Sequence, residues 1–203
     1  MTVEKRRYDS LRRTAQAQET RAEIAAAARR LFVAKGWSAT TVREVATEAG
    51  VSVPTVYAAY GDKTGLVRAL ADSADLVADL PREIADLESA TTPAAQLAAM
   101  AAYDRRLFER SGDVIALVRE AGRTEPELAA AYLAGRAAGD RTRVEVFSAW
   151  PSGVLRVDVT EAVDRYAAIC NLDVFTTLTV ERSWSPERVE AWWAELLARE
   201  LLA

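Results

Sequence analysis

The sequence contains no histidine and a single cysteine, Cys170, among its 203 residues. Without histidine, a zinc site with imidazole ligands and a Ser-His-Asp triad are both excluded, and one cysteine cannot form an internal disulfide. Because Cys170 lies in an apolar helical segment, it is typical of a small buried residue and not of a redox sensor. The sequence therefore predicts neither a metal site nor a cofactor, and no cluster of residues predicts an enzyme.

Long apolar runs and strand patterns are scarce as well. No stretch approaches the roughly 18 apolar residues of a membrane span, and the N-terminus lacks the apolar core of a signal peptide, so we expect a soluble cytoplasmic protein that does not bind a membrane. The short stretch 154–157 is interpreted as a loop. Helical periodicity elsewhere and a hydrophobic fraction of 50% predict an all-α fold with a buried core.

The most specific pattern lies in the first third of the chain. Thr41 and Glu44 have the spacing of a capping box at the start of a short helix, and Gly50 stands where that helix ends. Ser52 is a suitable N-cap for a second helix, which tolerates Pro54 in its first turn. Two short helices joined by a tight turn are therefore predicted, the geometry that places the second helix in a groove of DNA.

The pattern extends over about fifty residues as an ordered set: Gly36-Trp37, Thr40-Thr41, Val45-Ala46, Ala49-Gly50-Val51-Ser52, Thr55-Val56-Tyr57, Tyr60 and Lys63. With this set, residues 21–70 resemble the DNA-binding domain of the TetR family of bacterial regulators. The chain departs from the family at Tyr60, where Phe is commoner, and at Gly65, which costs roughly 1 kcal/mol relative to Ala inside a helix. The resemblance implies an N-terminal three-helix DNA-binding domain followed by a C-terminal helical domain for effector binding and dimerisation.

The resemblance also implies a set of DNA contacts: Thr41, Arg43, Ser52, Val53, Pro54, Thr55, Tyr57 and Lys63. Amides at a helix N-terminus bind phosphate, and a guanidinium fits a guanine edge, so Thr41 and Arg43 have a physical reason for these roles. Hydroxyls and an ammonium contact the backbone, and small apolar side chains approach a thymine methyl. The alternatives are that the threonine and serine only cap helices, that the two cations are solvated and that Tyr57 is a core residue.

Positive charge is concentrated at the start of the chain. Residues 1–70 hold twelve Lys and Arg against seven Asp and Glu, a net charge of +5, whereas the remainder has a net charge of −9. Five cations precede the first apolar pattern: Lys5, Arg6, Arg7, Arg12 and Arg13. We therefore expect residues 1–19 to form a flexible basic arm, which either inserts arginines into an adjacent minor groove or is only a solubilising tail.

Helical periodicity and capping signals divide the rest of the chain. A first helix is expected over about residues 21–35, opened by Thr20 and Glu23, within a DNA-binding domain at 20–66. Another helix follows Asp62 and runs through Leu76 toward Pro81, as the link to an effector-binding and dimerisation domain at 67–203. In that domain helices are expected over about 93–108, 113–121, 126–150 and 160–181, and a last one opens at Ser185.

Two groups of residues are assigned by resemblance within the helical domain. The dimer interface is expected at Phe175, Leu178, Val189, Trp192, Trp193 and Leu196. An effector pocket is expected at Tyr103, Phe108, Tyr132, Trp150, Tyr166 and Phe175. The alternative for both groups is that these apolar and aromatic side chains fill the core of a single chain.

Together these features predict a sequence-specific DNA-binding transcriptional regulator. By resemblance it is a homodimeric repressor that a small-molecule effector releases from a double-stranded operator, although no residue separates a repressor from an activator. A non-sequence-specific or architectural DNA-binding protein is the main alternative, and an all-α enzyme is the other.

Overall fold

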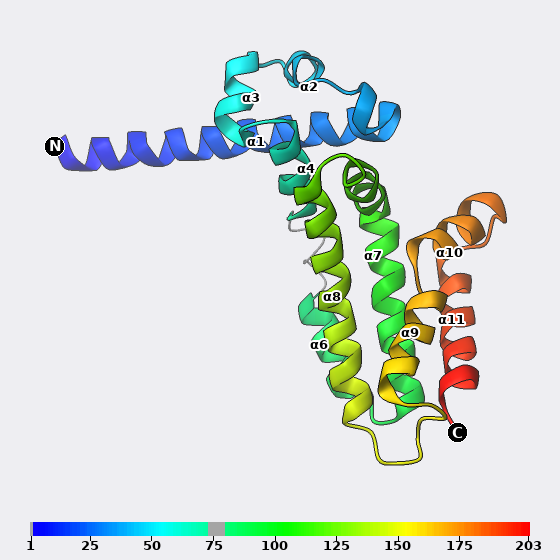
Figure 1. Ribbon diagram of the computed structural model, residues 1–203. Helices are drawn as coiled ribbons and strands as arrows, with labels where there is room; N and C mark the ends of the chain where they lie inside the picture. Colours follow the sequence, from blue (N-terminus) through cyan, green and yellow to red (C-terminus); the bar gives the residue numbers. More distant parts are fainter. Residues whose placement is uncertain (1, 73–79) are drawn as a thin grey trace. The chain divides into compact units, whose positions relative to one another are not determined.

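The computed structural model describes residues 2–72 and 80–203, with side chains from 12 to 72 and from 81 to 203. The chain divides into two compact units, Met1–Asp72 with Leu117–Ala129 and Ser73–Ala116 with Ala130–Ala203. The first unit contains four helices: α1 Thr2–Ala39, α2 Val42–Glu48, α3 Val53–Tyr60 and α4 Lys63–Ala71. In Figure 1, α2 and α3 lie on one side of α1.

The named elements in the described part of the second unit are all helices. Its elements are α6 Leu80–Ser89, α7 Pro93–Ala121, α8 Pro126–Ser148, α9 Val159–Ile169, α10 Leu172–Thr176, the π-helix η1 Thr177–Glu181 and α11 Pro186–Leu201. Helices α7 and α8 contribute their adjoining ends to the first unit. The all-α prediction is confirmed, and none of the described helices is long and apolar enough to cross a membrane.

Helix α1 differs from the prediction because it begins at Thr2 and not near residue 21. Neither Gly nor Pro occurs before Gly36, so nothing stops the helix, and Thr20 and Glu23 lie inside it without opening it. Side chains 12–19 are exposed, so helix propensity and not packing supports this extension, which replaces the expected flexible arm. The predicted break at Gly36 is confirmed by its φ of 79°.

The caps of α2 and α3 form as the sequence predicts. Thr41 accepts a hydrogen bond from the Glu44 amide, and the Glu44 carboxylate accepts one from the Thr41 amide. Ser52 caps α3 through the amide of Thr55 at 3.3 Å. Gly50 adopts a φ of 66° between the two helices, a conformation that glycine enters without steric cost. These caps fix the angle between α2 and α3.

The core of the first unit connects its helices. Buried residues on α1, α2, α3 and α4 pack together: Ile24, Ala28, Phe32, Val45, Ala46, Val56, Leu66, Val67 and Leu70. Phe32 stacks on Trp37 with ring centroids 5.9 Å apart. Helices α2 and α3 thus each bury one apolar face in this core. The expected continuation of α4 through Leu76 lies outside the described residues.

Helix α7 runs without interruption where two segments were predicted. Gly112, between the two predicted segments, is buried inside one helix, and a Cβ atom at this position would lie 2.9 Å from Leu172 Cδ1. Glycine costs about 1 kcal/mol in a helix interior without forcing its end. The residue therefore allows α10 to approach α7 closely and does not mark a boundary.

The helix predicted over 160–181 is broken at Cys170, whose ψ is 82°. Asn171 then caps α10 by accepting a hydrogen bond from the Val174 amide at 3.0 Å. Residues 154–157 form a loop as predicted, and Leu155 makes an isolated antiparallel bridge with Leu202. This bridge ties the end of α11 to the segment before α9.

Candidate nucleic-acid interface

Helix α3 presents an outer face that is small and uncharged, apart from one large side chain. Pro54 and Ala58 are exposed, Tyr57 is 50% exposed, and Val56 on the opposite face is buried. Val53 is half-buried at the start of the helix. Tyr57 is thus not a core residue, and this face has the size and chemistry needed to approach base edges in the major groove.

Thr41 and Glu44 form a closed arrangement at the N-terminus of α2. The Thr41 hydroxyl donates to the Glu44 carboxylate at 2.9 Å, and Lys35 Nζ donates to the same carboxylate at 2.7 Å. Hydrogen bonds from Lys35 and Thr41 lower the pKa of Glu44 to about 2. A phosphate approaching Thr41 would therefore meet a carboxylate that already occupies the end of this helix.

The hydroxyl groups of Ser52 and Thr55 are hydrogen-bonded to each other at the start of α3. The two oxygen atoms lie 2.8 Å apart, and the Ser52 hydroxyl also accepts from the Thr55 amide. Each hydroxyl keeps further hydrogen-bonding capacity, because a hydroxyl carries one donor and two acceptor positions. Both residues stabilise α3 and remain near its solvent-facing end.

Arg43 is exposed on the first turns of α2. Its carbonyl accepts a hydrogen bond from the Thr47 hydroxyl at 3.0 Å, which is a contact of the backbone and leaves the guanidinium out of the interaction. Elsewhere in the unit, Arg30 Nη2 pairs with Glu48 Oε1 at 3.1 Å. The Arg43 guanidinium is therefore exposed and takes no part in that ion pair.

The ammonium of Lys63, an expected DNA contact, is held within the first unit. It donates to the Trp37 carbonyl and lies 4.1 Å from the centroid of the Trp37 ring. Burial lowers the pKa of Lys63, and the carboxylates of Glu125, Glu120 and Glu44 oppose that effect. The side chain thus holds the start of α4 against the end of α1, and any DNA contact would use the ammonium's remaining donors.

Two further contacts in this unit were missed by the sequence analysis. The Tyr60 hydroxyl donates to the Arg21 carbonyl at 2.7 Å, and the Arg21 guanidinium lies 4.8 Å from the Tyr60 ring centroid. The Trp37 amide donates to Glu120 Oε1 at 3.2 Å. Both join residues 39 or more apart in sequence, so helical spacing carries no signal for them. They anchor α3 and the end of α7 to α1.

The aromatic residues expected to line an effector pocket fall into two packed groups in the second unit. Phe108 and Phe175 lie 6.0 Å apart and both contact Trp193, while Trp150 lies 4.9 Å from Phe147, which contacts Tyr166. Tyr166 and Phe175 belong to the hydrophobic core. Tyr103 and Tyr132 are half-buried and lie outside that core cluster. Tyr166, Phe175, Phe108 and Trp150 therefore lie in or against one core cluster, whereas Tyr103 and Tyr132 do not.

The residues expected at a dimer interface also separate. Val189 and Trp193 are fully buried within the single chain and Phe175 is 7% exposed, so the chain's own core already covers these three residues. On an amphipathic helix the sequence does not distinguish the core from an interface, because both bury apolar faces. Leu178, Trp192 and Leu196 keep partly exposed side chains.

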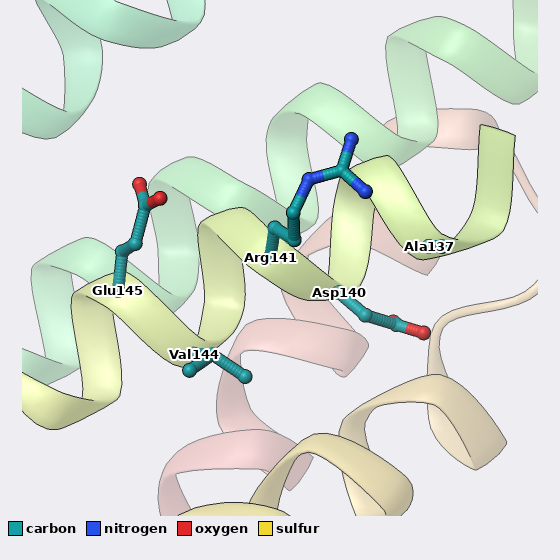
Figure 2. Close-up of a pocket in the computed structure, with 5 residues that line it drawn as sticks. All are labelled: Ala137, Asp140, Arg141, Val144 and Glu145. Atoms are coloured by element: carbon teal, nitrogen blue, oxygen red, sulfur yellow. The ribbon is translucent and has the colours of Figure 1, made fainter. Parts of the chain in front are cut away.

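A shallow surface hollow of about 340 Å³ lies on α8 and is lined by Ala137, Asp140, Arg141, Val144 and Glu145. In Figure 2, Asp140 and Val144 point to one side of the helix, and Arg141 and Glu145 point to the other. Because all five residues come from one helix, the hollow is not an enclosed pocket. It shares no residue with the expected effector site.

Comparison with known proteins identifies the first unit. Residues 24–70 match the family model for bacterial regulatory proteins of the tetR family. The HTH-type transcriptional regulator TtgR and the probable HTH-type transcriptional regulator ArpR, both of Pseudomonas putida, are each 45% identical over 64 residues. This stretch is 31% of the chain and 30% of each relative, so the chain matches less than a third of the length of these curated relatives.

Solved structures resemble nearly the whole chain. A protein from Saccharomonospora viridis, solved in complex with choline, has a TM-score of 0.74 at 19% identity and covers 92% of this chain and 99% of its own. NalD, the secondary repressor of the MexAB-OprM multidrug efflux pump in Pseudomonas aeruginosa, has a TM-score of 0.70 at 21% identity, covering 93% and 98%. At these identities the likeness shows the fold.

Proposed function

Because the chain belongs to the TetR family of bacterial regulatory proteins, we propose that it is a transcriptional regulator that acts in the cytoplasm by binding a specific DNA operator. The observation that carries this proposal is the outer face of α3, where Pro54, Tyr57 and Ala58 are exposed on a helix fixed at both ends. An α-helix fits the major groove, which is about 12 Å wide. We propose that the bound protein represses transcription and that an effector relieves this repression.

We assign base recognition to α2 and α3 and phosphate binding to their ends. Arg43 is the candidate for a guanine edge, whereas Val53 and Pro54 offer apolar contact to a thymine methyl. The exposed Tyr57 hydroxyl and the Thr55 hydroxyl are donors for the backbone. Thr41 and Lys63 have internal partners, so we expect them to contribute less to DNA affinity than Arg43.

The direct test of this assignment removes the Arg43 guanidinium. We expect Arg43→Ala to weaken operator binding by about 1 to 3 kcal/mol and to relax the preference at one base pair. Arg30→Ala is the matched control, because it removes the same charge from an exposed residue that pairs with Glu48. An equal loss for both variants on every duplex would reduce Arg43 to a non-specific charge.

We propose a homodimer whose interface uses the residues that the single chain leaves partly exposed. These are Leu178, Trp192 and Leu196, together with Val180, which is 73% exposed. A dimer presents two recognition helices to two half-sites, which a single short helix does not supply. Sedimentation velocity tests this proposal: Val180→Glu is expected to shift the protein toward the monomer, and a wild-type monomer at micromolar concentration contradicts it.

For the effector we propose a small molecule that binds the second unit, in line with the choline complex of the relative from Saccharomonospora viridis. Helix α7 begins in that unit and ends at the Glu120–Trp37 hydrogen bond. It is therefore a covalent route between effector and DNA-binding unit, in addition to the expected route through α4. An effector shifts the DNA-binding equilibrium only by its different affinity for the two states.

Selection of bound fragments from genomic DNA, followed by competition with unrelated duplex, tests the function as a whole. We expect one sequence to be retained over non-specific DNA by roughly a thousandfold or more at physiological salt. Equal retention of all duplexes would favour a non-sequence-specific or architectural DNA-binding protein. Failure to bind any duplex would refute the proposed function.

A further inference from the structure

A cluster of charged side chains is buried between α6, α7, α8 and α9 in the second unit. Asp104 is 3% exposed. It accepts hydrogen bonds from Arg143 Nη2 at 3.0 and 3.3 Å and from the Tyr166 hydroxyl at 3.0 Å. Arg143 also donates to Asp140 at 2.9 Å, and its guanidinium lies 4.4 Å from the Tyr166 ring centroid. Three helices are therefore joined at one buried carboxylate.

A second pair extends the cluster to α6. Arg106 is 4% exposed and its Nη2 donates to Asp86 at 3.3 Å. Asp86 lies one helical turn after Glu83, so both carboxylates are on the face of α6 that meets α7. Ile84, between them in sequence, is 50% exposed. Helix α6 thus turns two acidic side chains inward and leaves an apolar one in solvent.

Glu83 is the residue of this cluster that lacks a partner. Glu83 is 8% exposed. Its carboxylate makes no hydrogen bond or ion pair with the residues whose side chains the structure describes. Burial and the neighbouring Asp104 raise the pKa of Glu83 to about 7, while Arg143 and Arg106 act in the opposite direction. The two guanidiniums are close enough to act on Glu83, but each is engaged by another carboxylate.

The pairing within the cluster leaves one negative charge over. Arg143 is shared by Asp104 and Asp140, and Asp86 pairs with Arg106 and, at 3.7 Å, with Arg82, so three guanidiniums face these three carboxylates and Glu83. Buried carboxylates in proteins are normally paired, since an uncompensated one loses its hydration without gaining a partner. A cation brought to Glu83 would supply the missing partner, and the partly exposed Asp86 and Asp140 would favour its approach.

We propose that Glu83 and Asp104 form the polar end of a binding site for a small organic cation, an ammonium compound whose positive charge lies against the Glu83 carboxylate. This inference rests on the proposed function, because it names the chemical class of the effector. Arg143 and Tyr166 hold Asp104 in place, and Glu83 binds the ligand. Binding would tie α6 to α7, the helix whose Glu120 accepts a hydrogen bond from the Trp37 amide.

The test uses the full-length protein and two ammonium compounds, choline and benzyltrimethylammonium, in isothermal titration calorimetry. The control ligand is 3,3-dimethylbutan-1-ol, which has the shape of choline without its charge. We expect at least one of the two cations to bind and the neutral compound not to bind at the same concentrations. Glu83→Gln is expected to weaken cation binding tenfold or more, because it keeps the shape of the side chain and removes its charge.

Glu88→Gln is the matched control variant, since it removes the same charge from an exposed position on the same helix. It is expected to bind the cation like the wild type. The proposal is overturned if neither cation binds, if the neutral alcohol binds as tightly as choline, or if both variants lose affinity equally. The last of these results would indicate a general electrostatic attraction.

Operator binding without any ligand separates this inference from the proposed function. If Glu83→Gln binds the selected operator like the wild type but no longer responds to the cation, both conclusions stand. If the wild type binds the operator and ignores the cations, only the inference fails. If the cation binds at Glu83 while no duplex is bound, the site stands and the proposed function fails.

Discussion

Substitution of Gly65 by alanine separates what the structure predicts from what helix propensity predicts. Gly65 lies in the first turn of α4, where its amide donates to the Asp62 side chain at 2.7 Å. A Cβ atom at this position would lie 1.9 Å from the Tyr60 carbonyl oxygen. Propensity alone expects alanine to stabilise the helix by roughly 1 kcal/mol, whereas the structure expects a steric clash with backbone.

The magnitude follows from the distance that the two elements must move apart. Ordinary contacts of a Cβ atom begin near 3.4 Å, so the end of α3 and the start of α4 must separate by about 1.5 Å. Overpacking of this kind costs about 1 to 3 kcal/mol, and more where backbone is involved. Because the clash is with backbone, the upper end of this range applies, and after the gain in propensity a net loss of about 2 kcal/mol or more is expected, which lowers the Tm of a chain of this length by about 4 to 8 °C or more.

Differential scanning calorimetry measures the effect, with Gly135→Ala as the matched control. Gly135 lies within α8, and a Cβ atom added there would meet no other atom within 4 Å, so alanine is expected to stabilise by about 0.5 to 1 kcal/mol. The two glycine-to-alanine changes should thus have opposite signs. A Gly65→Ala protein as stable as the Gly135→Ala protein would refute the close approach of α3 and α4.

Three further predictions concern single side chains. Because the pKa of Glu83 is raised from 4.5 to about 7, its contribution to stability should be fully present below pH 4.5 and be lost, by up to about 3 kcal/mol, as pH rises through about 7; Glu83→Gln should remove this contribution in urea unfolding, and an unchanged profile would contradict it. The pKa of Glu44 is lowered to about 2, so its stabilising effect should be present above pH 4.5 and be lost as pH falls toward 2, and an acid titration of Glu44→Gln matching the wild type would exclude it. Thr40, 1% exposed, donates to the Gly36 carbonyl at 2.9 Å, so Thr40→Val should cost about 1 kcal/mol in denaturant unfolding, and a neutral effect would show that the carbonyl finds another partner.

Local signals in the sequence were sufficient for the caps and turns of the DNA-binding unit. The N-caps of α2, α3 and α4 are the expected residues Thr41, Ser52 and Asp62. Each capping hydrogen bond joins residues three apart, so the sequence carries a local signal for it. The same reasoning was wrong at Gly65, which it treated as a cost in propensity. The reason for this glycine is the carbonyl of Tyr60, and a contact between two helices leaves no periodic pattern.

The second unit was predicted less well, because its apolar and charged residues have several possible partners. Val189 and Trp193 lie on the apolar face expected of the last helix, but that face is buried in the chain's own core. Glu83, Asp104 and Arg143 come from three helices, so no spacing brings them together in the sequence. These residues form a cluster only when the chain folds and the helices pack together.

The helical extension of α1 changes where the charge for DNA binding is expected to come from. Lys35 pairs with Glu44, and Lys63 is held by Trp37, so cations near α2 and α3 are largely engaged within the unit. Residues 2–20 form about 28 Å of helix at 1.5 Å per residue and carry five Lys and Arg. A helix about 10 to 12 Å across does not enter a minor groove about 6 Å wide. As a helix the extension suits the phosphate backbone or the major groove, so the minor-groove hypothesis requires it to unfold on DNA, whereas the sequence preference is proposed to come from Arg43 and the outer face of α3.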